Sequence, residues 1–268
     1  MSIFRILCVV FVLFVSLGCE GNSLNHIKSK DKIRIGVSEK VPPIAYINEN
    51  GELDGFEIKL AKKIAKDLLG DESKAELIII SPNERASSLE SNQVDLVLAT
   101  FIPRSGDEAR VDFGTPYMKV AISIVNHYSD PSGMQDLLDS PLAIKKNTVL
   151  EDYFTTNYPN IELIKFDNVQ ECLDKLQKDR NINVAILNAT AFAWVRQNPQ
   201  FKISIPILGD DYMIAPAVKK GDKALLKWIN QEMDTLQKDG FFMQIYEASL
   251  QPFYGKELGA ENLLYNQE

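Results

Sequence analysis

The feature that most constrains the fold is an alternation of short apolar runs and amphipathic stretches that occurs twice, in residues 33–99 and 142–187. In the first copy, residues 33–37 have the two-residue apolar period of a strand, and residues 56–69 carry apolar side chains on one helical face. The run 94–99 is apolar except for one aspartate, which is typical of parallel strands buried on both faces. This order predicts an α/β fold with two parallel-core sheets and flanking helices.

Two further apolar stretches, 117–126 and 203–207, are predicted to cross between these units. In open parallel sheets, ligands bind beyond the carboxyl ends of the strands. If the two units face each other, six loops line one cleft. These loops are 38–46, 81–84 and 100–107 in the first unit, and 145–148, 167–168 and 188–190 in the second.

The first residues predict a signal peptide, 1–18, that is not part of the fold. Arg5 precedes an apolar core at 7–17, which is too short to span a bilayer comfortably. Cys19 follows a glycine and resembles the lipidated cysteine of bacterial lipoproteins, although Ser16 stands where leucine is typical. A plain secretory signal or an uncleaved anchor is the alternative. We predict an exported protein, lipid-anchored through a patternless tether at 19–30 to the periplasmic or cell-surface face of a bacterial membrane.

Composition narrows the possible partners. The formal net charge is −8, and loss of residues 1–18 removes one positive charge (Arg5) and no negative one, which leaves −9. An acidic protein of this kind is not expected to bind nucleic acid. If Cys8 leaves with the signal and Cys19 carries lipid, Cys172 remains alone, so no disulfide is expected and Cys172 is predicted to be a buried apolar residue. We predict no metal, no cofactor and a monomer.

The turn before the first helix carries a family resemblance. Asp54 is predicted to cap that helix, with Glu57 completing an arrangement close to a capping box. The sequence of 51–56, Gly-Glu-Leu-Asp-Gly-Phe, matches the Gly-x-Leu-x-Gly-Phe turn of family 3 bacterial extracellular solute-binding proteins, the receptors of polar amino-acid ABC transporters. Ile44 replaces the family's aromatic residue after Pro-Pro. Further matching pieces lie at 111–117, 143–148, 220–222 and 239–241.

The order and spacing of these pieces resemble the family over roughly 31–254. The resemblance implies a two-lobed periplasmic-binding-protein type II fold, in which two crossing strands join lobes that close on a ligand like a hinge. It divides the chain into lobe 1 (31–122 plus 208–258), lobe 2 (123–207) and a tail, 259–268, that we expect to be frayed.

The resemblance also implies a function. We expect an extracytoplasmic receptor that captures a small polar or anionic solute, an amino acid or a related compound, and delivers it to an ABC permease in the membrane. We do not expect an enzyme. A dehydratase-type enzyme on the same fold and a stand-alone ligand sensor are the alternatives. The two histidines, His26 and His127, have no obvious nucleophile or metal partner in the sequence.

One position of the family's binding motif is altered in the third loop. In the family, an arginine after Thr-x-Thr-x-Glu grips the ligand carboxylate. Ungapped alignment places Asp107 at this position, flanked by Arg104 and Arg110. We predict that Arg104 enters the cleft, with a solvated loop residue as the alternative, and that Arg110 forms a surface ion pair.

A second position is altered in the sixth loop. Asn188 stands where the family usually has an aspartate against the ligand ammonium, and Asp210 or Asp211 could substitute for it or form a solvated turn. With both positions altered, the expected ligand is a different polar or anionic solute, or the site is rebuilt. Thr148 matches a family threonine at a helix start, where it could hold a ligand carboxylate or merely cap the helix.

The remaining predicted site residues would shape the pocket. Thr100 begins the third loop and is expected to contact the ligand. Tyr46 and Phe101 are predicted to form an aromatic wall, whereas Tyr117 is expected to be structural, because tyrosines in apolar segments are more often core residues. Asn83 ends the second strand of the first unit and is predicted to form a pocket edge.

Overall fold

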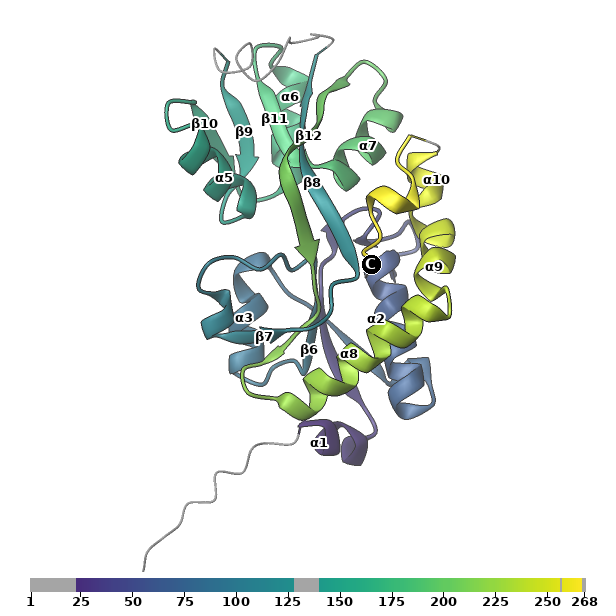
Figure 1. Cartoon of the computed structure of the whole chain (residues 1–268). Helices are drawn as coiled ribbons and strands as arrows, with labels where there is room; N and C mark the ends of the chain where they lie inside the picture. Colours follow the sequence, from purple (N-terminus) through teal and green to yellow (C-terminus); the bar gives the residue numbers. More distant parts are fainter. Residues whose placement is uncertain (1–22, 128–139, 256, 267–268) are drawn as a thin grey trace, which may run out of the picture.

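The computed structural model describes residues 23–127, 140–255 and 257–266. The chain forms two α/β lobes that are joined by two long strands, β8 (Met118–Asn126) and β12 (Lys202–Ile214). These strands run side by side from one lobe into the other (Figure 1). The predicted signal peptide and Cys19 lie outside the described residues.

Lobe 1 is built on a five-stranded sheet with the order β5-β1-β6-β13-β7. β1 pairs in parallel with β5 on one side and with β6 on the other, and β13 runs antiparallel between β6 and β7. The strands are β1 (Ile33–Val37), β5 (Ala75–Ile79), β6 (Leu96–Leu98), β7 (Val111–Phe113) and β13 (Ala217–Lys219). The helices are α2 (Phe56–Leu69), α3 (Arg85–Glu90), α8 (Lys223–Lys238) and α9 (Phe241–Ser249). A small antiparallel sheet comprises β2 (Lys40–Val41), β3 (Ala45–Ile47) and β4 (Leu53–Asp54).

Lobe 2 is built on a second five-stranded sheet, with the order β10-β9-β11-β8-β12. β9 pairs in parallel with β10 and β11, and β8 runs antiparallel to both β11 and β12. The strands are β9 (Leu142–Lys145), β10 (Leu163–Phe166) and β11 (Asn183–Leu187). The helices are α5 (Val149–Asn157), α6 (Val169–Lys178) and α7 (Asn188–Gln197), and α10 (Gln251–Tyr254) of the C-terminal segment packs beside α7.

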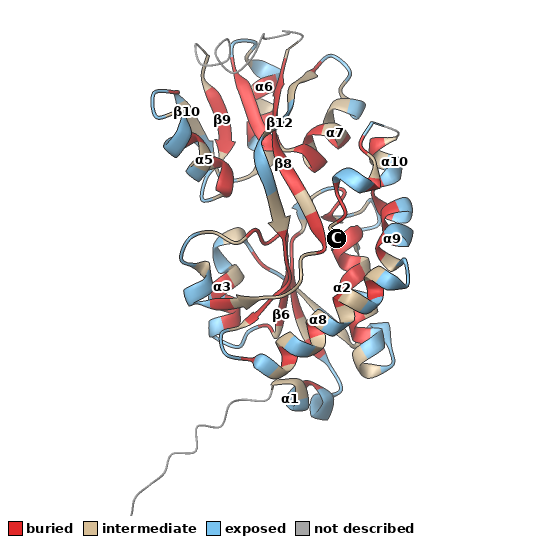
Figure 2. Ribbon diagram, viewed as in Figure 1, coloured by how far each residue is buried: buried red, intermediate tan, exposed pale blue. Residues whose placement is uncertain are grey.

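The core lies on the two sheets, as the apolar patterns predict. Figure 2 shows buried strands with helices whose outer faces are exposed. Helix α2 buries Phe56, Leu60 and Ile64 completely and leaves Lys62 and Lys66 exposed, which is the predicted amphipathic pattern. Cys172 is buried and unpaired, as predicted. Among the described helices, none is both long enough and apolar enough to cross a bilayer.

The predicted capping box of α2 is wrong. The N-cap residue is Gly55, and no side chain caps the helix; the Asp54 carboxylate accepts hydrogen bonds from the Gly55 N–H and from Lys59 instead. Glu57 is fully buried, where its Oε1 accepts hydrogen bonds from the Thr100 N–H (2.6 Å) and the Tyr117 hydroxyl (2.7 Å). Because α2 faces the end of β6, its first turn holds a loop of the cleft.

The segment predicted as a patternless tether is partly a helix, α1 (Ser23–Lys30). Its Ile27 is buried in the core, and the Ser23 hydroxyl donates a hydrogen bond to Asp222 at the start of α8. Two apolar residues, Leu24 and Ile27, on an otherwise polar helix are a weak signal in the sequence. Helix α1 lies at the end of lobe 1 that is far from lobe 2 (Figure 1).

The tail that we expected to be frayed is packed as far as it is described. Leu263 and Leu264 are buried against the start of β8. The Lys119 N–H donates to the Leu263 carbonyl (2.8 Å), so the C-terminal segment extends the edge where β8 leaves lobe 1. The two leucines account for this docking, because they remove apolar surface from water.

The second crossing is one continuous strand, β12, which extends beyond the apolar stretch 203–207 predicted from the sequence. β12 follows β8 with register shifts between Ile203 and Ile205, Ile205 and Leu208, and Leu208 and Tyr212. These irregularities accommodate Pro206, which has no N–H to donate to the ladder. Ser123 of β8 donates its hydroxyl to the Pro206 carbonyl (2.6 Å), which keeps the two strands paired at the bulge.

Candidate functional site

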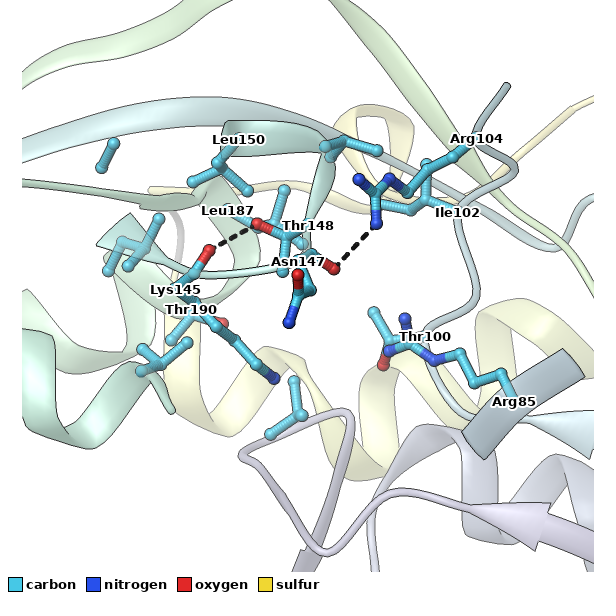
Figure 3. Close-up of a pocket in the computed structure, with 15 residues that line it drawn as sticks. Arg85, Thr100, Ile102, Arg104, Lys145, Asn147, Thr148, Leu150, Leu187 and Thr190 are labelled. Carbon is cyan, nitrogen blue, oxygen red and sulfur yellow. Dashed lines mark hydrogen bonds between the residues drawn. The ribbon is translucent and has the colours of Figure 1, made fainter. Parts of the chain in front are cut away.

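A cavity of about 80 Å³ lies between the lobes, which is the space of several water molecules. Each of the six loops expected to meet in one cleft contributes a lining residue or is adjacent to one. Figure 3 shows the polar side chains converging from both lobes. The lining comprises Val41, Arg85, Thr100, Ile102 and Arg104 from lobe 1, and Lys145, Asn147, Thr148, Val149, Leu150, Val169, Ala185, Ile186, Leu187 and Thr190 from lobe 2.

Thr100 is held in a strained conformation at the lobe 1 wall. Its φ of 50° lies in the left-handed region, which is unusual for a β-branched residue and costs free energy. The hydrogen bond from its N–H to the buried Glu57 carboxylate fixes the backbone there. Its side chain lines the cavity and is only 6% exposed, yet its hydroxyl has no hydrogen-bond partner among the described residues. A buried hydroxyl without a partner is suited to meet a ligand atom.

Arg85, the first residue of α3, brings a positive charge to the same wall. Its guanidinium lies over the Phe101 ring, 5.5 Å from the centroid, and no described residue forms a hydrogen bond or ion pair with it. Burial lowers the pKa of Arg85 to about 10, although the Glu57 carboxylate opposes this shift. An arginine in this state remains charged and can form charge-assisted hydrogen bonds with an anion in the cavity.

Lys145, at the carboxyl end of β9, supplies a second positive charge, from lobe 2. Its side chain extends toward the lobe that carries Arg85 and Thr100 (Figure 3). Burial and the nearby Arg85 charge lower the pKa of Lys145 to about 8. No carboxylate of the described residues pairs with its ammonium group. Two cations, one from each lobe, therefore face one cavity.

Arg104 also lines the cavity, but its guanidinium is already engaged. Its Nε and one terminal nitrogen donate to the two carboxylate oxygens of Asp152 in α5, at 2.7 and 2.8 Å. The other terminal nitrogen donates to the Asn147 carbonyl (3.0 Å). Arg104 belongs to lobe 1 and both partners belong to lobe 2, so this ion pair bridges the lobes.

Thr148 lines the cavity at the start of α5 without capping the helix through its side chain. Its hydroxyl donates to the Lys145 carbonyl (2.8 Å), which secures the turn that carries Lys145. The next two residues, Val149 and Leu150, also line the cavity. The first N–H groups of a helix have no intrahelical acceptor and favour an anion, so this end of α5 adds to the positive potential of the cavity.

Four predicted site residues do not line the cavity. Phe101 is buried behind Arg85 and packs edge-on against Phe113. Tyr46 packs against Phe253 in a neighbouring interlobe groove. Asn83 is exposed outside the cavity.

Asn188 is the fourth. It is buried behind the wall, where its amide oxygen accepts hydrogen bonds from the Ala189 N–H (2.8 Å) and the Ala121 N–H (3.2 Å). The residue before it, Leu187, lines the cavity instead.

The other charged residues that the sequence analysis considered for ligand binding lie outside the cavity. Arg110 forms a surface ion pair with Glu90 (2.7 Å). Asp107 accepts a hydrogen bond from the Arg104 N–H (3.0 Å), which shapes the loop. Asp210 and Asp211 are exposed. None of these residues lines the cavity.

Motif alignment missed the two charges that face the cavity. Arg85 lies one position beyond the second predicted loop, and Lys145 begins the fourth. The rule that ligands bind at strand ends was the available signal, because both residues lie at or next to a loop that it selects. The family motif directed attention to the third loop, where the arginines are engaged in ion pairs.

The family of the chain follows from comparison with known proteins. Residues 33–251 match the model of the bacterial extracellular solute-binding proteins, family 3, and the chain belongs to this family. An ABC transporter glutamine-binding protein of Bacillus subtilis is 29% identical over 231 residues, which are 84% of each chain. An ABC transporter arginine-binding protein of Escherichia coli is 24% identical over 219 residues, 80% of this chain and 89% of the relative.

Solved structures show the same fold. The solute receptor for L-cysteine of Neisseria gonorrhoeae superposes with a TM-score of 0.85 at 39% identity, covering 91% of this chain and 99% of the receptor. A cysteine-binding protein from Campylobacter jejuni gives a TM-score of 0.86 at 38% identity, covering 92% and 100%. The predicted family, two-lobed fold and role as a solute-binding receptor of an ABC importer are thereby confirmed. These relatives are binding proteins, and membership of an extracellular family implies export.

Proposed function

We propose that this receptor captures a small anionic solute, and that Arg85 and Lys145 hold the anion between the lobes. The observation that supports this proposal is the pair of cations, one from each lobe, that face the interlobe cavity while no carboxylate of the described residues lines it. Burying charges without a counter-ion destabilises a protein, so the arrangement suits a site completed by an anion. Thr100 and the start of α5 would supply additional hydrogen bonds.

The same arrangement explains how binding would close the receptor. An anion that contacts Arg85 in lobe 1 and Lys145 in lobe 2 interacts with both only when the lobes are together. A ligand shifts a conformational equilibrium by its differential affinity for the two states. The Arg104–Asp152 ion pair joins the two lobes, and it would add to the stability of the form that docks on the permease.

The relatives narrow the solute further. The two solved receptors at 38% and 39% identity are named for cysteine, itself a small molecule. We infer that the solute is a short carboxylate of similar size, and that the receptor releases it unchanged.

Anchoring and assembly are inferred from the sequence alone. We propose that the exported chain is lipidated at Cys19 and acts as a monomer. In this arrangement, α1 would place the anchor at the end of lobe 1 far from lobe 2. Mass spectrometry of the mature N-terminus tests the lipid, with Cys19→Ser as the control, and an unmodified Cys19 would refute the anchor.

Substitution of Arg85 tests the proposed site. Short carboxylates, with and without an amino group, are screened by thermal shift, and the best is titrated by calorimetry. Arg85→Gln should weaken its affinity about 10- to 100-fold, because a hydrogen bond to a charged group contributes about 1.5–3 kcal/mol. Arg110→Gln is the matched control, because it removes an arginine from a surface ion pair. Unchanged affinity in Arg85→Gln, or no binding of any carboxylate to the native receptor, would refute the proposal.

A further inference from the structure

We propose that the solute of this receptor is a carboxylate without an α-ammonium group, such as a short 2-oxo acid, 2-hydroxy acid or dicarboxylate. This inference rests on the proposed function and names the class of its ligand. It is carried by the composition of the cavity wall, which joins two cations, Arg85 and Lys145, to apolar side chains and includes no carboxylate of the described residues.

The charges that face the cavity favour anions alone. A zwitterionic amino acid needs a carboxylate of the protein against its ammonium, because an unpaired charge is costly to bury. No aspartate or glutamate among the described residues lines the cavity. Arg85 and Lys145 would in addition repel a third positive charge.

The nearest acidic side chains are committed elsewhere. Asp152 forms the two-pronged ion pair with Arg104, and Asp107 accepts the Arg104 N–H. Glu57 lies behind Thr100, with no exposed surface, and one of its oxygens accepts two hydrogen bonds. Its other oxygen is buried and does not reach the cavity wall.

The cavity wall at the carboxyl end of β11, in lobe 2, is also unsuited to an ammonium group. Ala185, Ile186 and Leu187 line the cavity there, and Leu187 projects beside Thr148 (Figure 3). Asn188, the neighbouring polar residue, has its amide oxygen occupied by two backbone N–H groups. An ammonium at this wall would lose its water without meeting a carboxylate of the described residues, whereas an apolar carbon atom would be accommodated.

The donors at the cavity suit the oxygen atoms of the proposed ligands. Arg85 and Lys145 carry only donors, and the Thr100 hydroxyl lacks a partner among the described residues. A keto oxygen or a second carboxylate accepts hydrogen bonds and so can satisfy these groups. An ammonium group only donates hydrogen bonds, so it cannot satisfy Arg85 or Lys145, which accept none.

Matched ligand pairs test the inference on the native receptor. Calorimetry compares pyruvate and L-lactate with L-alanine, L-malate with L-aspartate, and 3-mercaptopyruvate with L-cysteine. In the pair that binds, the member without the amino group should bind at least about tenfold more tightly, since burying an unpaired polar group costs about 1–3 kcal/mol. An amino acid that binds as tightly as its partner would overturn the inference.

The outcome also separates the inference from the proposed function. If an amino acid binds tightly and this binding is lost in Arg85→Gln, the inference is refuted and the proposed anion site stands. Binding that is insensitive to Arg85→Gln, or no binding by any carboxylate, would refute the proposed function and the inference together.

A gain-of-function variant provides a second measurement. Leu187→Asp places a carboxylate on the cavity wall, and the ratio of affinities should move toward the amino acid by about tenfold or more. Leu187→Asn is the control, because it adds polarity without charge. Circular dichroism verifies that both variants fold. A folded Leu187→Asp receptor whose ratio does not change would contradict the inference, and the matched pairs decide it if the variant does not fold.

Discussion

Lys145 is the residue through which solution pH should act on ligand binding. In the free receptor its pKa is lowered to about 8 by burial and by the charge of Arg85 on α3. The Cys172 thiol of α6 also faces it, but burial raises the pKa of that thiol to about 12, so it stays neutral when Lys145 titrates. A bound anion favours the protonated amine and raises its pKa.

Affinity for an anionic solute is therefore expected to be highest below pH 8 and to fall as pH rises above it, because the ligand must then bring a proton to Lys145. The fall should approach, and not exceed, about tenfold per pH unit. Calorimetry between about pH 7 and about pH 9.5 measures it. Lys145→Arg keeps the charge and should remove the dependence. An affinity that is constant over this range in the native receptor would contradict the role of Lys145.

Thr100 and Glu57 show which properties of single residues could be predicted from the sequence and which could not. Thr100 was predicted in the site because it follows a buried strand, and it lies in the cavity wall. Its left-handed backbone and its bond to Glu57 were not predictable, because Glu57 occupies a position that suits a capping box. The burial of Glu57 depends on the contact between α2 and the end of β6, and local sequence patterns do not encode that contact.

Secondary-structure elements with strong periodicity were predicted most accurately. The bounds of β1 and α2 agree with the expected segments. Helix α7 was not predicted, and α1 and the C-terminal segment were expected to lack structure. These three elements are held by tertiary contacts, such as α7 against β8 and Leu263 against the core, and contacts of this kind are not visible in local patterns.

The ion pair between Arg104, in the loop after β6, and Asp152 of α5 is expected to make a small contribution to ligand affinity. The side chains of Arg104 and Asp152 are 35% and 52% exposed, and ion pairs at such positions contribute about 0.2–1 kcal/mol. Arg104→Ala should therefore weaken binding about two- to fivefold, far less than Arg85→Gln. The sequence alone favoured Arg104 as the anchor of the ligand.

A double-mutant cycle measures this bridge. Asp152→Ala should weaken binding about as much as Arg104→Ala, and the double variant should lose little more than either, because both substitutions remove the same ion pair. Calorimetry with the carboxylate that binds best provides the four affinities. Complete loss of binding in Arg104→Ala alone would show that Arg104 grips the solute, and the proposed site would then be wrong.

At the scale of the molecule, the two lobes and the paired strands β8 and β12 bring two cations to one cavity. Each lobe contributes one cation and one face of that cavity, so the proposed site needs both lobes. The family resemblance predicted this architecture, since the order of strands and helices and the scattered motifs agree with it. The ligand could not be predicted in the same way, because both family positions that recognise an amino acid are altered here.

The most direct test of this account is the crystal structure of the receptor with its tightest carboxylate. The account predicts the carboxylate within hydrogen-bond distance of the Arg85 guanidinium, an oxygen of the solute at the Lys145 amine, and an intact Arg104–Asp152 ion pair. A solute whose carboxylate is held by Arg104, with Asp152 released, or a solute seated beside Tyr46 in the neighbouring groove, would contradict it.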